Sequence, residues 1–491
     1  MARAEPAKKC CSSRVLRQTF MADSLAERWM LGLCTIAGAM LGLLLAMRPA
    51  AADATAASIH TRAEFIQEPV FGGQAYVYQA GIGQTRSVVL IHGIGDKASR
   101  DWSRLIPVLA LHYHVVTFDL PGFGRSTKGN KLYSPANYVA FVRFVAARYI
   151  HGPFDLIGHS LGAAIALRYA ATYPNDVRSL VLADVAGILH RMAYSQYLSH
   201  LGIDQIPTLY PNQREQLQDL VANALGLLER LRPDQDLLVD DALLRREFLD
   251  SDPAKIAGLA LVLDDFSDII LRVQAPTLLV WGDRDPIAPL RTAEVLLANI
   301  PQARLKILHN CGHTPMDDRP LEFRDIVLQA LQNPGPTREV ALQFTASARG
   351  VPASKRTGSC RDQRNRVFEG NYDTIHIHDC RDVRIRNAQI RELDIDDASV
   401  QIDGSHIGGN PGGLIATDAN VTVTGGSISA PIAITASDSH LDLAGVTLNG
   451  SEAAVRAPQR SRILFSVSYL HSRYSNGSAH GMWIVGPHSP L

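Results

Sequence analysis

Hydrophobic positions between residues 60 and 330 fall into short β-branched runs that alternate with longer amphipathic runs. Short apolar runs are typical of buried parallel strands, and the longer ones of helices that cover them. The pattern therefore predicts an α/β domain over residues 60–332. Each predicted strand ends at a cluster of Gly, Asp, His or Ser, and the ends of parallel strands form the ligand crevice of such sheets. The predicted strands are residues 87–91, 114–118, 154–157, 180–183, 277–280 and 305–308.

The segment between the fourth and fifth of these strands is too long for a plain crossover connection. It has helical periodicity, for example over residues 213–230 and 240–249. We expect a helical cap over the strand ends at about residues 187–273. An ordinary surface excursion is the alternative.

The hydrophobic pattern changes after a Pro- and Gly-containing linker at residues 333–359. Short Val/Ile/Leu runs begin at positions 383, 400, 421, 441 and 463, spaced by 17, 21, 20 and 22 residues, and most follow an Asp- or Asn-containing turn. A unit of this size cannot bury its own apolar face, so repetition indicates a stacked solenoid. Residues 360–480 resemble a small, all-β, right-handed parallel β-helix. A small β-sandwich is the alternative.

The N-terminal region pairs a basic segment with an apolar one. Residues 1–28 carry six Lys/Arg, and residues 29–47 are uncharged and as a helix would reach about 28 Å. This pattern fits a transmembrane anchor with a cytoplasmic N-terminus or the core of a signal peptide. Both place the chain after about residue 53 on the extracytoplasmic (periplasmic) side, membrane-anchored or exported after cleavage. A buried core helix is the third option.

The overall composition changes this picture little. Hydrophobic residues make up 46% of the chain, and the 48 basic and 48 acidic side chains cancel. The chain therefore has no net positive charge that would attract nucleic acid. Six cysteines are too few for a disulfide scaffold. In an oxidising compartment Cys360 and Cys380 could pair.

The strongest chemical signal is at residues 158–162, which read Gly-His-Ser-Leu-Gly. The motif directly follows a predicted strand and precedes a helix-forming run. A sharp strand-to-helix turn presents the hydroxyl of Ser160 at the top of the sheet, and the flanking glycines remove Cβ atoms that would clash. The spacing predicts a nucleophilic serine.

A serine nucleophile needs a base, and the base needs an orienting carboxylate. Asp285 and His313 each lie just past a predicted strand, and the order Ser, Asp, His along the chain is the one such folds use. We therefore predict Ser160 as nucleophile, His313 as general base and Asp285 as the acid. Asp283 is the nearer alternative acid, and Asp184, at an earlier strand end, is the other.

Three motifs, Gly-His-Ser-Leu-Gly, Trp-Gly-Asp-Arg-Asp-Pro and Gly-His-Thr-Pro, resemble those of the α/β-hydrolase family over about residues 65–330. The resemblance implies an α/β-hydrolase sheet with a helical cap, and the triad named above. His92-Gly-Ile-Gly resembles the family's oxyanion loop, which implies that the backbone N–H groups of Ile94 and Leu161 stabilise the oxyanion. His92 itself is expected to stabilise a turn, and Arg125 to belong to a structural turn.

A serine at this position points to acyl transfer, so we expect an enzyme that cleaves an ester-type bond through an acyl-enzyme. Carbon–carbon bond hydrolases and acyltransferases use the same triad and are the alternatives. The substrate expected is a small or lipid-like acyl compound. The sequence contains no competing motif for metal or nucleotide binding, so no cofactor or metal is implied.

The C-terminal segment offers a hypothesis of another class, a glycan-binding or scaffold protein that uses the β-helix. His376, His378 and acids such as Asp394 could suggest a metal site or polysaccharide cleavage. A solvated strand face explains them more simply. Few aromatic platforms for sugars are present, so we expect a spacer or a docking module for protein or glycan.

Overall fold

The structure is a computed structural model that describes residues 59–190, 193, 239–335 and 355–491. The predicted anchor at residues 29–47, the basic segment before it and the helix expected at residues 213–230 lie outside these ranges. Among the helices within them, none is long and apolar enough to cross a membrane.

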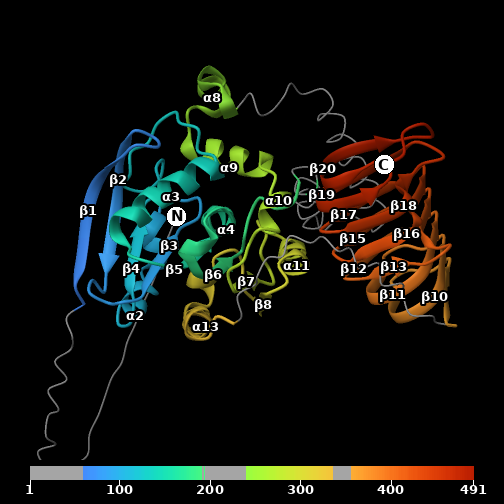
Figure 1. The fold of residues 1–491 in the computed structure, drawn as a ribbon, viewed down its shortest axis with the longest axis horizontal. Helices are drawn as coiled ribbons and strands as arrows, with labels where there is room; N and C mark the ends of the chain where they lie inside the picture. The colour runs from blue at the N-terminus through green and yellow to red at the C-terminus, as the bar shows by residue number, and fades with distance from the viewer. Residues whose placement is uncertain (1–58, 191–192, 194–238, 336–354) are drawn as a thin grey trace, which may run out of the picture. The chain divides into compact units, whose positions relative to one another are not determined.

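An eight-stranded sheet forms the first domain, in the order β1-β2-β4-β3-β5-β6-β7-β8 (Figure 1). From β4 to β8 all neighbours are parallel, whereas β1 with β2 and β2 with β4 are antiparallel. The sequence did not predict β1 and β2. The strands are β1 (Thr61–Glu68), β2 (Gly73–Ala80), β3 (Ser87–Ile91), β4 (His114–Phe118), β5 (Phe154–His159), β6 (Val177–Ala183), β7 (Thr277–Gly282) and β8 (Ala303–Leu308).

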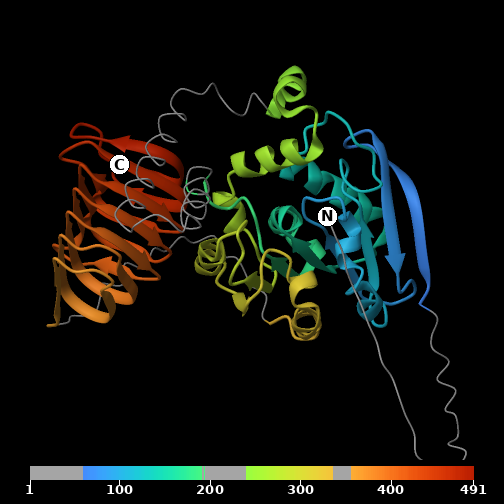
Figure 2. The ribbon, with the colours of Figure 1, turned by 180° about the vertical axis from the view of Figure 1, so that it is seen from behind.

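Helices cover both faces of this sheet (Figures 1 and 2). On one face, α3 (Pro135–Tyr149), α4 (Leu161–Thr172) and α11 (Leu290–Asn299) contribute to one hydrophobic cluster. On the other, α2 (Ile106–Leu109) and α13 (Pro320–Gln332) contribute to a second. Every residue of β3, β5 and β7 is buried, as expected for strands covered on both sides.

Three helices of the predicted cap region are described: α8 (Ala242–Leu249), α9 (Pro253–Leu263) and α10 (Ser267–Ile270). Asp241 and Asp252 cap the first two by accepting hydrogen bonds from backbone N–H groups of the first turn. The helix expected at residues 240–249 is therefore present. Residues 191–192 and 194–238 of the region lie outside the described residues.

The C-terminal domain is all-β, and its strands stack mainly in parallel (Figure 1). Val383 pairs with Val400, Val400 with Val421, Val421 with Leu441 and Leu441 with Ile463, so the predicted repeat spacing is the register of the stack. This parallel pairing differs from the antiparallel sheets of a β-sandwich. The strands are β9 (Thr357–Arg361), β10 (Val367–His378), β11 (Val383–Asp396), β12 (Ser399–Asp403), β13 (His406–Gly408), β14 (Gly413–Thr417), β15 (Asn420–Thr424), β16 (Ser427–Ser437), β17 (His440–Ala444), β18 (Thr447–Arg456), β19 (Ser461–Ser472) and β20 (Asn476–Val485).

Alternate side chains of the stacked strands form the interior of this domain, because successive residues of a strand point to opposite faces. Asp379, Asp397, Asp418 and Asp438 adopt positive φ at successive turns, which explains the Asp-containing turns of the repeat. The last strand, β20, runs antiparallel to β19.

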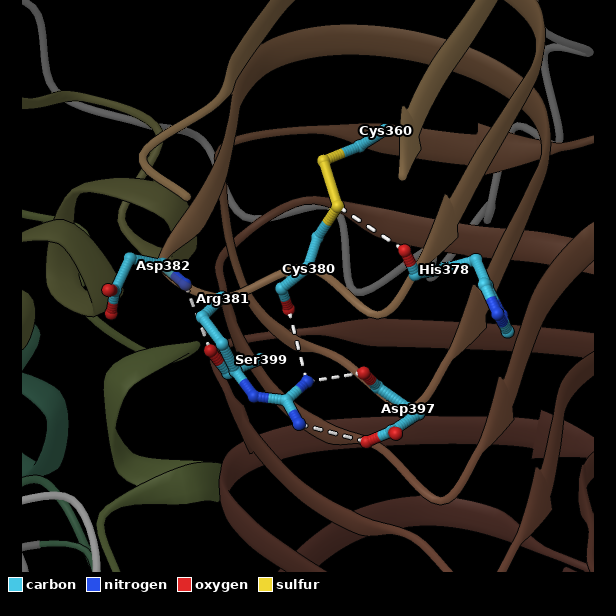
Figure 3. Close-up of a disulfide and its surroundings, with 7 residues drawn as sticks. All are labelled: Cys360, His378, Cys380, Arg381, Asp382, Asp397 and Ser399. Atoms are coloured by element: carbon cyan, nitrogen blue, oxygen red, sulfur yellow. Dashed lines mark hydrogen bonds and ion pairs between the residues drawn. A yellow bond between two sulfur atoms is a disulfide. The ribbon is translucent and has the colours of Figure 1, made fainter. Parts of the chain in front are cut away.

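A disulfide between Cys360 and Cys380 joins β9 to the turn after β10 (Figure 3). The neighbouring Arg381 forms an ion pair with Asp397 of the next turn, at 2.9 Å. The pairing that the sequence left open is therefore present in the structure.

The described residues from position 59 onward belong to one compact unit. Arg291 of α11 donates to both carboxylate oxygens of Asp442 in β17, at 2.6 and 3.1 Å. The Tyr469 hydroxyl of β19 donates to the carbonyl oxygen of Ser267 in α10 at 2.6 Å. Leu464 and Val467 belong to the same hydrophobic cluster as α4 and α11. The C-terminal domain is thus packed against the α/β domain.

Candidate active site

Ser160 is the single residue between the end of β5 and the start of α4. Its φ of 53° and ψ of −119° give it a backbone conformation that residues with a side chain rarely adopt. A Cβ atom at Gly158 would lie 2.3 Å from the carbonyl oxygen of Gly162, and one at Gly162 would lie 2.3 Å from that of Ile91. Glycine is therefore required on both sides of the turn, and the predicted strand–serine–helix geometry is present.

His313 follows β8 and brings its ring to the Ser160 hydroxyl. The His313 Nε2 lies 2.9 Å from Ser160 Oγ, and its Nδ1 lies 2.8 Å from Asp285 Oδ2. With Nδ1–H donating to the carboxylate, Nε2 is left to accept a hydrogen bond from the serine hydroxyl. Three residues distant in sequence thus form one continuous chain of hydrogen bonds.

Asp285 is held rigidly in the loop after β7. Its side chain is fully buried. Its Oδ1 accepts hydrogen bonds from the backbone N–H groups of Ile287 at 2.7 Å and Ala288 at 3.0 Å. Because Oδ1 is occupied in this way, Oδ2 is directed at His313.

The two alternative acids have other partners. Asp283 accepts a hydrogen bond from Nδ1 of the exposed His309, at 3.0 Å, and this bond lowers the pKa of Asp283. Asp184 is fully buried, and its Oδ1 accepts a hydrogen bond from the Gly282 N–H at 2.9 Å. Of the three acids that the sequence offered, Asp285 is the one bonded to the His313 ring.

A second histidine, which the sequence analysis did not single out, supports the first. His159 Nε2 lies 2.6 Å from the carbonyl oxygen of His313, so Nε2–H donates to it. Burial, reinforced by the nearby His313, lowers the pKa of His159 to about 3, and the ring is neutral. The only feature of His159 that the sequence shows is that it precedes Ser160. Any residue at the end of a strand would have the same position, so the sequence did not indicate its contact with His313.

The loop after β3 lies against the serine: a Cβ atom at Gly93 would be 2.9 Å from Ser160 Cβ. Ile94 is the next residue of this loop. Leu161 is the first residue of α4, where backbone N–H groups have no acceptor within the helix. The structure therefore places Gly93 and Leu161 next to Ser160, and the oxyanion role of Ile94 and Leu161 stays a prediction.

His92 and Arg125 have structural contacts. His92 Nε2 accepts a hydrogen bond from the Leu120 N–H at 2.8 Å, and burial lowers the pKa of His92 to about 4. Arg125 forms an ion pair with the buried Asp119 at 2.9 Å and lies over the Tyr76 ring. Both side chains thus stabilise turns near the site.

In the C-terminal domain, the exposed His376 and the half-buried His378 are paired with Asp394 at 3.4 Å and Asp396 at 2.7 Å, respectively. These are cross-strand pairs between β10 and β11. Over the described ranges, no group of His, Cys, Asp or Glu is arranged to hold a metal ion.

The sheet order, the strand–serine–helix turn and the Ser–His–Asp contacts define a hydrolase with an α/β sheet. A family model described as the alpha/beta hydrolase fold matches residues 86–320. A 2-hydroxy-6-oxononadienedioate/2-hydroxy-6-oxononatrienedioate hydrolase from Pseudomonas putida is 31% identical over 259 residues, which cover 50% of this chain and 88% of the relative.

Monoacylglycerol lipase abhd6-A from Xenopus laevis is 30% identical over 274 residues, which cover 52% of this chain and 79% of the relative. A solved hydrolase from Pseudomonas aeruginosa is 24% identical with a TM-score of 0.41, over 55% of this chain and 98% of its own. On the identity and coverage of the first two relatives, the chain belongs to the α/β-hydrolase family, and it is an enzyme of the hydrolase class.

Proposed function

We propose that the protein cleaves an ester-type bond of a small or lipid-like acyl compound, with Ser160, His313 and Asp285 as its catalytic triad. The observation that carries the proposal is the position of the His313 ring, which is hydrogen-bonded to Ser160 on one side and Asp285 on the other. A hydroxyl so placed can lose its proton as its oxygen attacks a carbonyl.

In the proposed reaction, His313 Nε2 takes the proton of Ser160 while the serine oxygen bonds to the acyl carbon. The buried Asp285 carboxylate stabilises the imidazolium that forms. The N–H groups of Ile94 and Leu161 donate to the oxyanion, and the dipole of α4 adds in the same sense. His313 then protonates the leaving alcohol. Water repeats these steps and releases the acid from the acyl-enzyme.

The substrate class is supported by a relative named as a monoacylglycerol lipase, itself an ester hydrolase by name. Another relative is named as a 2-hydroxy-6-oxononadienedioate hydrolase, which favours carbon–carbon bond hydrolysis as the second candidate. An acyltransferase would use the same acyl-enzyme and differ in the acceptor.

A fluorophosphonate probe tests the nucleophile. The full chain is expected to be labelled, and Ser160→Ala to abolish labelling; labelling of the variant at the wild-type rate contradicts the proposal. Turnover of p-nitrophenyl esters of graded chain length then reports the acyl pocket. Turnover of 2-hydroxy-6-oxononadienedioate, with no turnover of the esters, would favour the second candidate.

We also propose that the C-terminal domain is a right-handed parallel β-helix that serves as a spacer or docking module, and that residues 29–47 anchor or export the chain. The Cys360–Cys380 disulfide supports an extracytoplasmic location, because disulfides persist mainly in oxidising compartments.

A further inference from the structure

Strand β19 is buried on both faces, whereas strands β15 and β17 of the same stack include exposed and half-buried positions. Residues 463–470 of β19 are all buried. Phe465 belongs to the hydrophobic cluster of the C-terminal domain, whereas Leu464 and Val467 belong to the cluster of the α/β domain. The strand therefore packs against its own domain on one side and against the α/β domain on the other.

The chain turns a corner at equivalent positions of successive layers, which are Gly404, Gly425, Gly445 and Val467. They are equivalent because the residues just before them pair in register. Their φ values are 55°, 65°, 67° and 50° in that order. Positive φ costs glycine little, but it strains a β-branched residue. The valine at the last of these corners is therefore held in a conformation that the surrounding structure must stabilise.

The corners lie against the α/β domain, which accounts for both residue types. A Cβ atom at Gly425 would lie 3.3 Å from the Cβ of Ala298, and one at Gly445 would lie 2.9 Å from Nδ2 of Asn299. Glycine at these corners therefore lets α11 approach closely. Val467 is fully buried in the hydrophobic cluster of the α/β domain. Burial of its side chain there offsets the strain of its backbone.

Residues beside Val467 bind both ends of the cap region. The Ser466 Oγ accepts a hydrogen bond from the backbone N–H of His190 at 3.0 Å, where the chain leaves β6 for the cap region. The Tyr469 hydroxyl donates to the Ser267 carbonyl oxygen at 2.6 Å, where the chain returns toward β7. These four residues are buried. In β20, the His480 ring lies edge-on to the His190 ring, with centroids 4.9 Å apart.

The cap helix α9 connects this contact to the active site. A Cβ atom at Gly258 of α9 would lie 3.8 Å from Cδ1 of Ile94, which belongs to the loop that lies against Ser160. Residues 264–266 alone separate the end of α9 from Ser267 in α10. Because this connection is so short, a shift of α10 also moves the end of α9. The place of α9 beside the active site therefore depends on where β19 holds α10.

We propose that the C-terminal domain positions the cap helix α9 beside the active site, by holding both ends of the cap region on β19 and β20. The inference rests on the proposed ester hydrolysis, because it assigns α9 a part in binding the acyl chain. Ser466 and Tyr469 are positioning residues in this scheme. They act on substrate binding through α10 and α9, and they leave the chemistry at Ser160 unchanged.

The double variant Ser466→Ala/Tyr469→Phe tests the inference in the full chain, because it removes both hydrogen bonds and keeps the buried apolar atoms. For the longest p-nitrophenyl ester that wild type hydrolyses, KM is expected to rise about 3- to 10-fold with kcat within about twofold. For p-nitrophenyl acetate, both constants should stay within about twofold, because its acyl group is too short to need the cap.

Ser439→Ala is the control, because the buried Ser439 hydroxyl forms its bonds within the C-terminal domain. It accepts a hydrogen bond from the Ala419 N–H at 3.2 Å and donates to the Ser437 carbonyl oxygen at 2.7 Å. This variant should melt below wild type and keep the wild-type ratio of kcat/KM for long and short esters. An unchanged ratio in the double variant, or an equal change in Ser439→Ala, would overturn the inference.

Hydrogen exchange measured by mass spectrometry tests the same inference without turnover. In the double variant, backbone amides of α9 and α10 are expected to exchange about fivefold faster or more than in wild type, with those of α3 unchanged, because local opening then breaks fewer bonds. Unchanged exchange in α9 and α10 would overturn the inference. Fluorophosphonate labelling keeps the two proposals apart: an unlabelled wild type contradicts the triad, whereas the exchange rates still decide the role of the C-terminal domain.

Discussion

At the scale of single residues, the site depends on which of three nearby acids faces His313. Asp283 and Asp285 are two positions apart in one loop, yet the first is bonded to His309 and the second to His313. The backbone N–H groups of Ile287 and Ala288 determine which acid contacts His313, because they orient the Asp285 carboxylate. The order of residues along the chain narrows the choice of the acid to a few candidates. The backbone path of the loop after β7 determines which of them contacts His313.

Substitution of these two acids should have unequal effects. Asp285→Asn is expected to lower kcat for ester hydrolysis by about 10³- to 10⁴-fold, because an amide favours the wrong tautomer of His313. Asp283→Asn is expected to stay within about threefold of wild type. Steady-state kinetics at pH 7.5 measures both, and equal losses would contradict the assignment of the acid.

Two buried neutral histidines predict loss of stability in acid. His92 and His159 have pKa values lowered to about 4 and about 3, whereas in the unfolded chain each ionises near pH 6.5. Below that pH the unfolded state binds more protons, so stability falls by about 1.4 kcal/mol per pH unit for each histidine. Urea unfolding at pH 7, 6 and 5 measures the slope. His92→Gln should reduce it, and an unchanged slope would contradict the neutral assignment of His92.

At the scale of elements, the turn from β5 to α4 leaves no room for side chains beside Ser160. Gly162→Ala would place its Cβ 2.3 Å from the Ile91 carbonyl oxygen, and the cost is expected to be about 1 to 3 kcal/mol of unfolding free energy. Gly129→Ala is the control, because a Cβ there has no heavy atom within 4 Å. Urea unfolding compares them, and equal stability of the two variants would contradict the close packing.

The sequence predicted the central strands better than the edge of the sheet. Strands β3 to β8 are apolar or bounded by turn residues, so their periodicity is plain. In β1 only Ile66 and Glu68 are buried, and in β2 buried positions alternate with polar ones. Such strands lack the continuous apolar run by which the central strands were predicted, although alternation is itself a pattern typical of strands. His159 was missed as a partner of His313 because a buried polar side chain is identified by its neighbours in space.

At the scale of the whole molecule, Arg291 links the α/β domain to the C-terminal one. The pair with Asp442 is mostly buried, with side-chain exposures of 20% and 17%. Arg291→Ala is expected to lower the unfolding free energy by about 1 to 3 kcal/mol, because Asp442 loses its charged donor. Arg456→Ala, which removes an exposed pair with Glu452, should change it by less than about 0.5 kcal/mol. Thermal unfolding compares the two, and an Arg291→Ala protein as stable as Arg456→Ala would contradict the packing.

The proposed location is tested by fusion of alkaline phosphatase after residue 60, motivated by the Lys/Arg bias before residue 29. The enzyme should be active, because it folds only where its disulfides form. Alkaline phosphatase joined to a known secretion signal is the positive control. An inactive fusion at residue 60, together with an active control, would place the domains in the cytoplasm.

The reversal of chain direction at β20 has a consequence for assembly. A stack of parallel strands is in principle extendable, since its final layer presents the same pattern of N–H and C=O groups that its neighbours used. Here β20 folds back on β19, and antiparallel ladders space their hydrogen bonds differently from parallel ones. A second molecule that approached this end would meet β20, which runs opposite to the stacked strands, so the repeat of parallel layers ends there.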